Sequence, residues 1–126
     1  MSKTVVYSDK APEPIGPYSQ AIQHGNLLFV SGQIAIQKSS GKLVTSNIED
    51  ETIQVLTNVE EVLKAAGLNF SNVVKTTIFL KDMNGFPRVN EIYGKYFVDA
   101  PPARETVEVS RLPKDVNVEI SCIAVK

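Results

Sequence analysis

The stretch PPARETVEVSRLPKDVNVEIS, residues 101–121, decides the fold class because it holds two alternating segments on either side of a proline-containing loop. Side chains along a strand point alternately to the two faces of a sheet, and valine recurs at every second position in both segments. The stretch therefore predicts two strands. It also places Arg104 and Glu119 where a half-buried sheet favours neutral side chains.

The hydrophobic pattern predicts how these two strands would pair as an antiparallel hairpin. Directly opposed residues share a face, so the valines coincide only when paired residue numbers sum to an odd value, as with Val109 opposite Val116. In that register Arg104 and Glu119 become opposed or diagonal neighbours on the polar face. Such a pair is usually a solvated ion pair worth at most about 1 kcal/mol, so the pattern alone leaves both a surface pair and a binding site open.

Three further segments have the composition of strands. Residues 4–8, 26–36 and 72–80 are rich in β-branched and aromatic side chains, and the last two alternate clearly. Residues 9–20 contain three prolines and a glycine, which predicts a long loop. Residues 38–44 predict a turn that leads into an additional edge segment.

Two segments have helical spacing. Apolar residues recur at intervals of three and four over residues 53–66, after a possible capping box at residues 46–49 and before Gly67. A second helix is predicted over residues 86–96, with Asn84 as its N-cap. Together with the strands, this order predicts an α+β fold, a two-layer sandwich in which two helices cover one face of a mixed sheet.

Length and composition limit the classes of function. A chain of 126 residues fits one domain, residues 1–126. A net charge of −1 without basic segments argues against binding to nucleic acid or to an anionic membrane. The chain has neither a stretch typical of a signal peptide nor an apolar run long enough to span a bilayer, so a cytoplasmic location is expected.

Single reactive residues give no catalytic motif by themselves. Cys122 lies in an alternating apolar run and is interpreted as a buried thiol, and His24 as a solvated residue beside a turn. Lys75 is interpreted as an edge or solvent-facing residue of its strand rather than a Schiff-base amine. One histidine and one cysteine do not form a metal site, so no metal is expected.

Four fragments, in order along nearly the whole chain, closely resemble the Rid family, the YjgF-like reactive-intermediate imine deaminases. The fragments are GPYSQA (16–21), VSGQI (30–34), VNEIYGKYF (89–97) and PPARETVEVSRLPKDVNVEI (101–120). The resemblance implies a chorismate-mutase-like fold and a homotrimer with sites between subunits. It also implies cofactor-independent hydrolysis of 2-imino acids, such as 2-iminobutanoate and 2-iminopropanoate, to 2-keto acids.

The resemblance also implies roles for individual residues. Arg104 would bind the substrate carboxylate, and Glu119 would activate water or move a proton. The remaining expected contacts are Tyr18, Ser31 and Asn90, which would line the pocket, and Gly32 and the backbone of Thr106, which would help to fix the ligand.

Two departures from the family pattern affect the expected pocket. Thr106 stands where many members have cysteine, and Ser121 stands where a second glutamate is frequent. We expect these changes to alter substrate preference more than chemistry. Two other functions remain open: a non-catalytic trimer that binds small carboxylates and, against the charge argument, an endoribonuclease.

Overall fold

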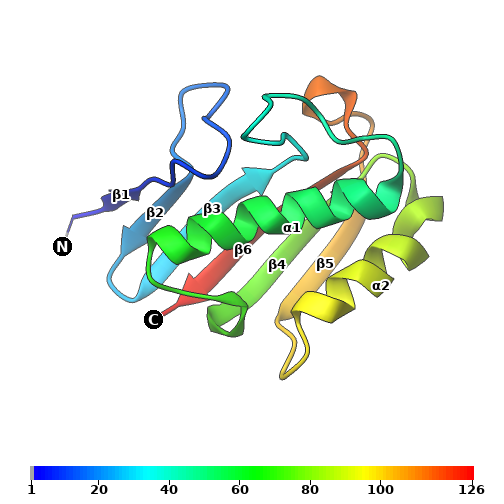
Figure 1. Ribbon diagram of the computed structural model, residues 1–126. Coiled ribbons are helices and arrows are strands. Elements are labelled where there is room, and N and C mark those ends of the chain that lie inside the picture. The colour runs from blue at the N-terminus through cyan, green and yellow to red at the C-terminus, as the bar shows by residue number, and fades with distance from the viewer. Residues whose placement is uncertain (1) are drawn as a thin grey trace.

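Two helices pack against one face of a six-stranded mixed sheet in the computed structural model, which describes residues 2–126 (Figure 1). The strand order across the sheet is β1-β2-β3-β6-β4-β5, and β4 with β5 is the parallel pair. The elements are β1 Thr4–Val6, β2 Ala21–His24, β3 Leu27–Gln33, α1 Ile48–Ala65, β4 Val73–Leu80, α2 Phe86–Tyr96, β5 Ala103–Glu108 and β6 Val118–Val125.

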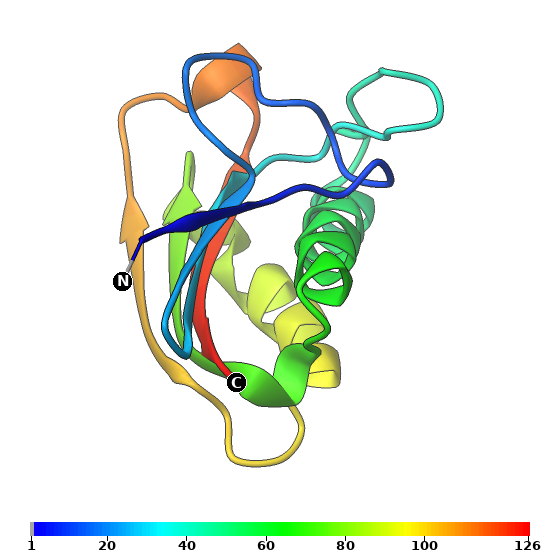
Figure 2. The ribbon, with the colours of Figure 1, turned by 90° about the vertical axis from the view of Figure 1, so that its left-hand side faces the viewer.

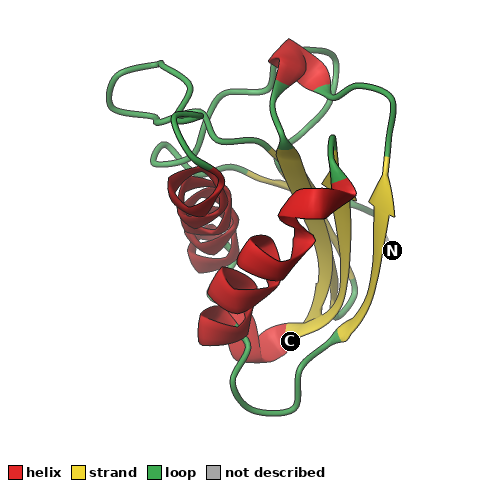
Figure 3. Cartoon of the chain, turned by 90° about the vertical axis from the view of Figure 1, so that its right-hand side faces the viewer, coloured by secondary structure: helices red, strands yellow, loops and turns green. Residues whose placement is uncertain are grey.

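Both helices lie on the same side of the sheet, and the opposite face is bare (Figure 2 and Figure 3). The core between the two layers is formed by inward-facing strand residues and by one face of each helix, including Leu28, Leu56, Leu63, Ile78, Val89 and Ile120. This arrangement confirms the predicted α+β two-layer sandwich. Within residues 2–126, no helix combines the length and apolar character needed to cross a bilayer.

Both ends of α1 follow from local chemistry, although its start differs by one residue from the prediction. The side chain of Asn47, not Ser46, caps the helix by accepting a hydrogen bond from the Asp50 backbone N–H at 2.8 Å. Three acidic residues in the first turn complement the helix dipole. The helix ends before Gly67, whose φ of +75° is a conformation that glycine adopts without strain, as the sequence predicts.

The start of α2 also differs in detail from the prediction. Asp82, not Asn84, provides the cap: its carboxylate accepts from the Asn84 N–H and begins the short 3₁₀ turn Met83–Gly85. The helix itself begins at Phe86 with Pro87 in its first turn, where the missing N–H of proline needs no partner.

The predicted hairpin of the last two strands is wrong, because β4 lies between them. β5 pairs in parallel with β4, placing Arg104 opposite Thr76, whereas β6 pairs antiparallel with β4, placing Glu119 opposite Phe79. Thr76 is fully buried under the helices, while Phe79 points to the other side of the strand. Arg104 and Glu119 therefore lie on opposite faces of the sheet.

The sixth strand is β2, which the sequence analysis missed. It is four residues long and forms a hairpin with β3, and the two-residue loop begins at Gly25, where φ is +60°. The edge segment predicted after residues 38–44 is reduced to a single bridge between Ile36 and Leu43.

One part of the bare face of the sheet is apolar. Strand register aligns Val5, Ile22, Phe29 and Ile123 in one row across β1, β2, β3 and β6. Val5 is 60% and Phe29 43% exposed in the isolated chain. A continuous apolar row of this kind is typical of a surface that contacts another protein.

Candidate functional site

One group of the predicted site residues surrounds a small cavity at the start of β6. The cavity measures about 40 Å³ and brings together Tyr18 from the N-terminal loop, Gly32 from the end of β3 and Glu119 from β6. The other lining residues are Pro12, Glu13, Pro14, Ile15, Gln20, Gln33, Ile34, Ile36 and Pro113. The cavity wall is thus both polar and apolar, and it includes two carboxyl groups.

The carboxyl group of Glu119 is packed closely against the backbone of Gly32. A Cβ atom at Gly32 would lie 2.8 Å from the carboxyl carbon of Glu119, closer than such atoms approach, so only glycine fits without displacing the acid. Burial raises the pKa of the Glu119 carboxyl above its ordinary value. An acid with a raised pKa beside a cavity is well suited to exchange protons with a bound molecule.

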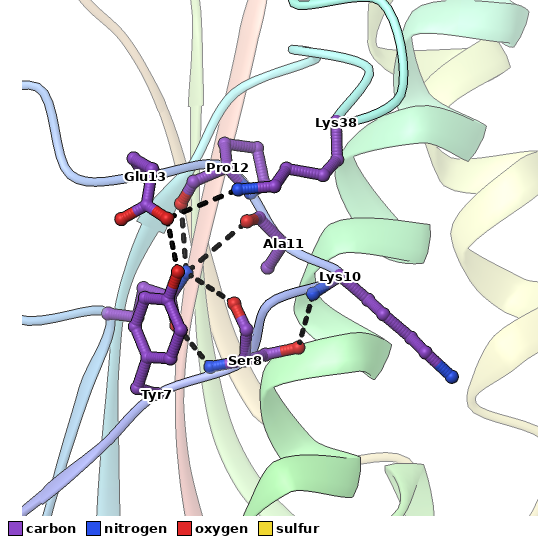
Figure 4. Close-up of polar contacts among 8 residues, drawn as sticks. Tyr7, Ser8, Lys10, Ala11, Pro12, Glu13 and Lys38 are labelled. Carbon is purple, nitrogen blue, oxygen red and sulfur yellow. Dashed lines mark hydrogen bonds and ion pairs between the residues drawn. The ribbon is translucent and has the colours of Figure 1, made fainter.

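The loop that carries Tyr18 is held in place by polar contacts with its neighbours. The buried Gln20 side chain accepts from the Ser8 N–H at 2.7 Å and donates to the Ser8 and Pro12 carbonyls. Glu13 accepts from the Tyr7 hydroxyl and from Lys38, as Figure 4 shows. These contacts keep one wall of the cavity ordered.

Ser31 also forms hydrogen bonds with the loop that carries Tyr18. Its hydroxyl donates to the Ser19 carbonyl at 2.6 Å, and its backbone N–H donates to the Gln20 carbonyl at 2.9 Å. The side chain that the sequence analysis expected to line the pocket is therefore engaged in fixing the segment next to Tyr18.

A second group of predicted residues lies on the helix-covered face, around Arg104. The guanidinium donates from Nη1 to the Asn90 side-chain oxygen at 2.8 Å. Its central carbon lies 4.9 Å from the ring centre of Tyr93 and 5.3 Å from that of Phe86. Within residues 2–126, Arg104 forms no ion pair with a carboxylate, whereas Arg88 and Arg111 each have one.

Tyr93 is held beneath Arg104 by the sheet. Its hydroxyl shares a 2.7 Å hydrogen bond with the hydroxyl of Thr76, the residue opposite Arg104 on β4. Burial raises the pKa of the Tyr93 phenol, although the hydrogen bond with Thr76 and the nearby charge of Arg104 act in the opposite direction. The phenol therefore remains neutral at physiological pH.

Thr106 lies two residues beyond Arg104, on the same face of β5. Its hydroxyl is buried and has no hydrogen-bond partner within the part of the chain that the structure describes. A buried hydroxyl without a protein partner is uncommon.

The predicted residues therefore form two separate groups. Tyr18, Gly32 and Glu119 share one cavity, while Asn90 and Arg104 are joined by a hydrogen bond on the other face. The sequence analysis missed the contacts of Phe86 and Tyr93 with Arg104. Their signal is the spacing of Phe86, Asn90 and Tyr93, which places all three on one side of a helix.

The structure also locates three residues to which the sequence analysis gave no catalytic role. Cys122 is buried, which raises the pKa of its thiol to about 12, and His24 is exposed at the end of β2. Lys75 is solvent-facing, as one of the two predicted alternatives has it, but it is not an edge residue: it lies on the inner strand β4 and forms an ion pair with Glu105 at 3.1 Å. No group of three or more potential metal-ligating side chains occurs within residues 2–126.

Comparison with known proteins identifies the family. The sequence profile of the family described as Endoribonuclease L-PSP matches residues 8–126. A solved Rid-family protein from Yersinia pestis is 48% identical, with a TM-score of 0.96 over 99% of this chain and 100% of its own. The chain belongs to the Rid (YjgF-like) family. This membership confirms the resemblance seen in the sequence.

Other relatives are also similar to this chain. A RutC family protein from Pyrococcus horikoshii is 53% identical over 98% of both chains. The mouse 2-iminobutanoate/2-iminopropanoate deaminase is 49% identical over 98% of this chain and 92% of its own. The solved structure of Escherichia coli TdcF with bound serine is 37% identical, with a TM-score of 0.93 over 98% of both chains.

Proposed function

We propose that this protein hydrolyses 2-imino acids and their enamine tautomers, including 2-iminobutanoate and 2-iminopropanoate, to 2-keto acids and ammonia without a cofactor. The proposal rests on two groups: an arginine without an acidic partner within residues 2–126, and an acid whose pKa is raised by burial beside a small cavity. The imine deaminase activity in the name of the mouse relative supports it.

Arg104 is proposed to bind the substrate carboxylate. A guanidinium offers two parallel N–H donors that match the two oxygens of a carboxylate, which a lysine cannot reproduce. The serine bound to TdcF also carries an α-carboxylate, which supports a small carboxylate as the ligand of a related protein such as this one.

Glu119 is proposed to act on the attacking water. With the iminium form of the substrate, the carboxylate takes a proton from water as the oxygen bonds to the imine carbon, giving a neutral carbinolamine. Glu119 then returns that proton to the nitrogen. The C–N bond breaks, ammonia leaves with the bonding electrons, and the carbinol hydroxyl gives its proton to the Glu119 carboxylate as the C=O bond of the keto acid forms. The imine carbon is already electrophilic, so this reaction needs orientation and proton transfer only.

The charges of the cavity favour this substrate over RNA. The residues that line it include Glu13 and Glu119 but no lysine or arginine. An acidic wall suits the positively charged nitrogen of an iminium and repels a phosphodiester. With Arg104 added for the carboxylate, the site matches a small zwitterion.

We propose that neighbouring copies of the chain complete such a site together, because Arg104 and Glu119 lie on opposite faces of the sheet. The bare apolar face offers the contact surface, and the resemblance implies closure as a homotrimer with the chorismate-mutase-like architecture. We expect light scattering at micromolar concentration to give about three times the mass of one chain. A monomer would remove the proposed intersubunit site.

The decisive assay for the function uses a dehydratase to generate 2-aminoacrylate or 2-iminobutanoate and follows keto acid formation with and without this protein. We expect faster formation in its presence. A protein that only binds carboxylates would leave the rate unchanged.

Mixing two inactive variants tests whether each site is shared. In a trimer assembled from equal amounts of Arg104→Ala and Glu119→Gln chains, a site is intact when both neighbours supply the unchanged residue. Random assembly makes this about one half times one half, so about a quarter of wild-type activity should return after co-refolding. A site within one chain predicts no recovery in the mixture.

A further inference from the structure

We infer that one side of α2, formed by Phe86, Asn90 and Tyr93, sets the orientation of Arg104, so that its guanidinium is already positioned when the substrate carboxylate binds. This inference rests on the proposed function and adds to it two positioning residues, Phe86 and Tyr93.

The first step is the contact between the guanidinium and Asn90. Nη1 donates to the side-chain oxygen of Asn90 at 2.8 Å. A guanidinium has five N–H donors, so this bond restrains the orientation of the group and leaves donors for a carboxylate.

The second step is the restraint imposed by the two rings. The central carbon of the guanidinium lies 4.9 Å from the Tyr93 ring centre and 5.3 Å from the Phe86 ring centre, within the range of cation–π contacts. Such contacts limit the orientations of a long, flexible side chain before the substrate arrives, which lowers the entropy cost of binding.

The third step is the rigidity of the rings themselves. Tyr93 is buried, and its hydroxyl is fixed by the Thr76 hydroxyl at 2.7 Å. Phe86 begins α2 and packs against the hydrophobic core. Asn90, by contrast, is exposed, and its side-chain oxygen is already taken by Arg104, so its role is to orient the arginine.

The test compares Phe86→Leu with Phe86→Tyr, which retains the ring. Phe70→Leu is the matched control, since Phe70 is also a partly buried aromatic packed against the same core, and its ring contacts are with Tyr96 and Phe97. Two readouts are needed: KM and kcat for 2-iminobutanoate, and the Kd for 2-oxobutanoate by titration calorimetry.

We expect Phe86→Leu to raise KM and Kd by about 3-fold to 30-fold, with kcat changed less, because a cation–π contact is lost before and during the reaction. Phe86→Tyr should restore binding to within about twofold, and Phe70→Leu should leave Kd unchanged. In an Arg104→Lys background, which has no fork to orient, Phe86→Leu should add less than about a twofold change.

Equal effects of Phe86→Leu in the wild-type and Arg104→Lys backgrounds, or an equal effect of Phe70→Leu, would overturn the inference in favour of a general packing role. Failure of the proposed function is distinguished by the wild-type protein. Binding of 2-oxobutanoate without acceleration of keto acid release refutes the deaminase activity alone, whereas absence of wild-type binding refutes the orientation of a carboxylate anchor as well.

Discussion

Replacement of Glu119 by glutamine should reduce imine hydrolysis by about 100-fold to 10,000-fold while the protein still folds and assembles. The amide keeps the shape of the carboxyl group beside Gly32 and still forms hydrogen bonds, but it cannot take up a proton from water. The measurement is kcat/KM for 2-iminobutanoate, with light scattering to verify assembly. Near wild-type turnover would assign Glu119 to structure and require another activator of the water.

Glu91→Gln is the matched control for this variant, since it removes a carboxylate from an exposed position on α2.

The melting temperature of Glu119→Gln gives a second, independent test of the buried carboxyl group. Because burial raises the pKa of Glu119, the folded chain binds this proton more tightly than the unfolded chain, and its contribution to stability decreases as pH rises through the folded pKa. Glu119→Gln should therefore melt higher than wild type at neutral pH, and this gain should disappear in acid.

The same raised pKa gives a kinetic expectation for the wild-type protein. The ionised carboxylate is the proton acceptor, so kcat/KM should fall on the acid side at a higher pH than for an ordinary glutamate. This acid limb should be absent in the residual activity of Glu119→Gln.

The layer architecture was predictable because periodicity reports directly on local structure. Spacings of three and four identify the two helices, and alternation identifies the long strands, since each pattern follows from backbone geometry. Strand neighbours could not be predicted in the same way. The pattern of 104–109 and 116–122 shows which side chains share a face of one strand, but it carries no information about β4, which lies between these strands.

The relative positions of the site residues could not be predicted from local sequence patterns either. The fragments that resemble the Rid family point to Arg104 and Glu119, yet their separation onto two faces follows from long-range pairing of β4 with β5 and β6. The contact of Phe86 and Tyr93 with Arg104 depends on where α2 packs over the sheet. Helical spacing places these two residues together, but it does not show which strand residue meets them.

The substitution Arg104→Lys separates a surface ion pair from a substrate anchor, because it keeps the positive charge and removes the planar fork. Arg104 already lacks a carboxylate partner within residues 2–126, so the loss of a solvated ion pair cannot account for a large effect. If Arg104 anchors the substrate carboxylate, the change should cost about 2 to 4 kcal/mol of transition-state stabilisation. That corresponds to a decrease of about 30-fold to 1000-fold in kcat/KM.

The melting temperature of Arg104→Lys should change little, because the lysine stem still covers part of the Tyr93 and Phe86 rings and the residue is only partly buried. Arg88→Lys is the matched control: Arg88 is an exposed arginine on α2 whose carboxylate partner, Glu49, lies 3.7 Å away. We expect that variant to retain wild-type kinetics, since a surface ion pair tolerates either cation. Keto acid release at the wild-type rate by Arg104→Lys would refute the anchoring role and leave Arg104 as a residue that only packs against α2.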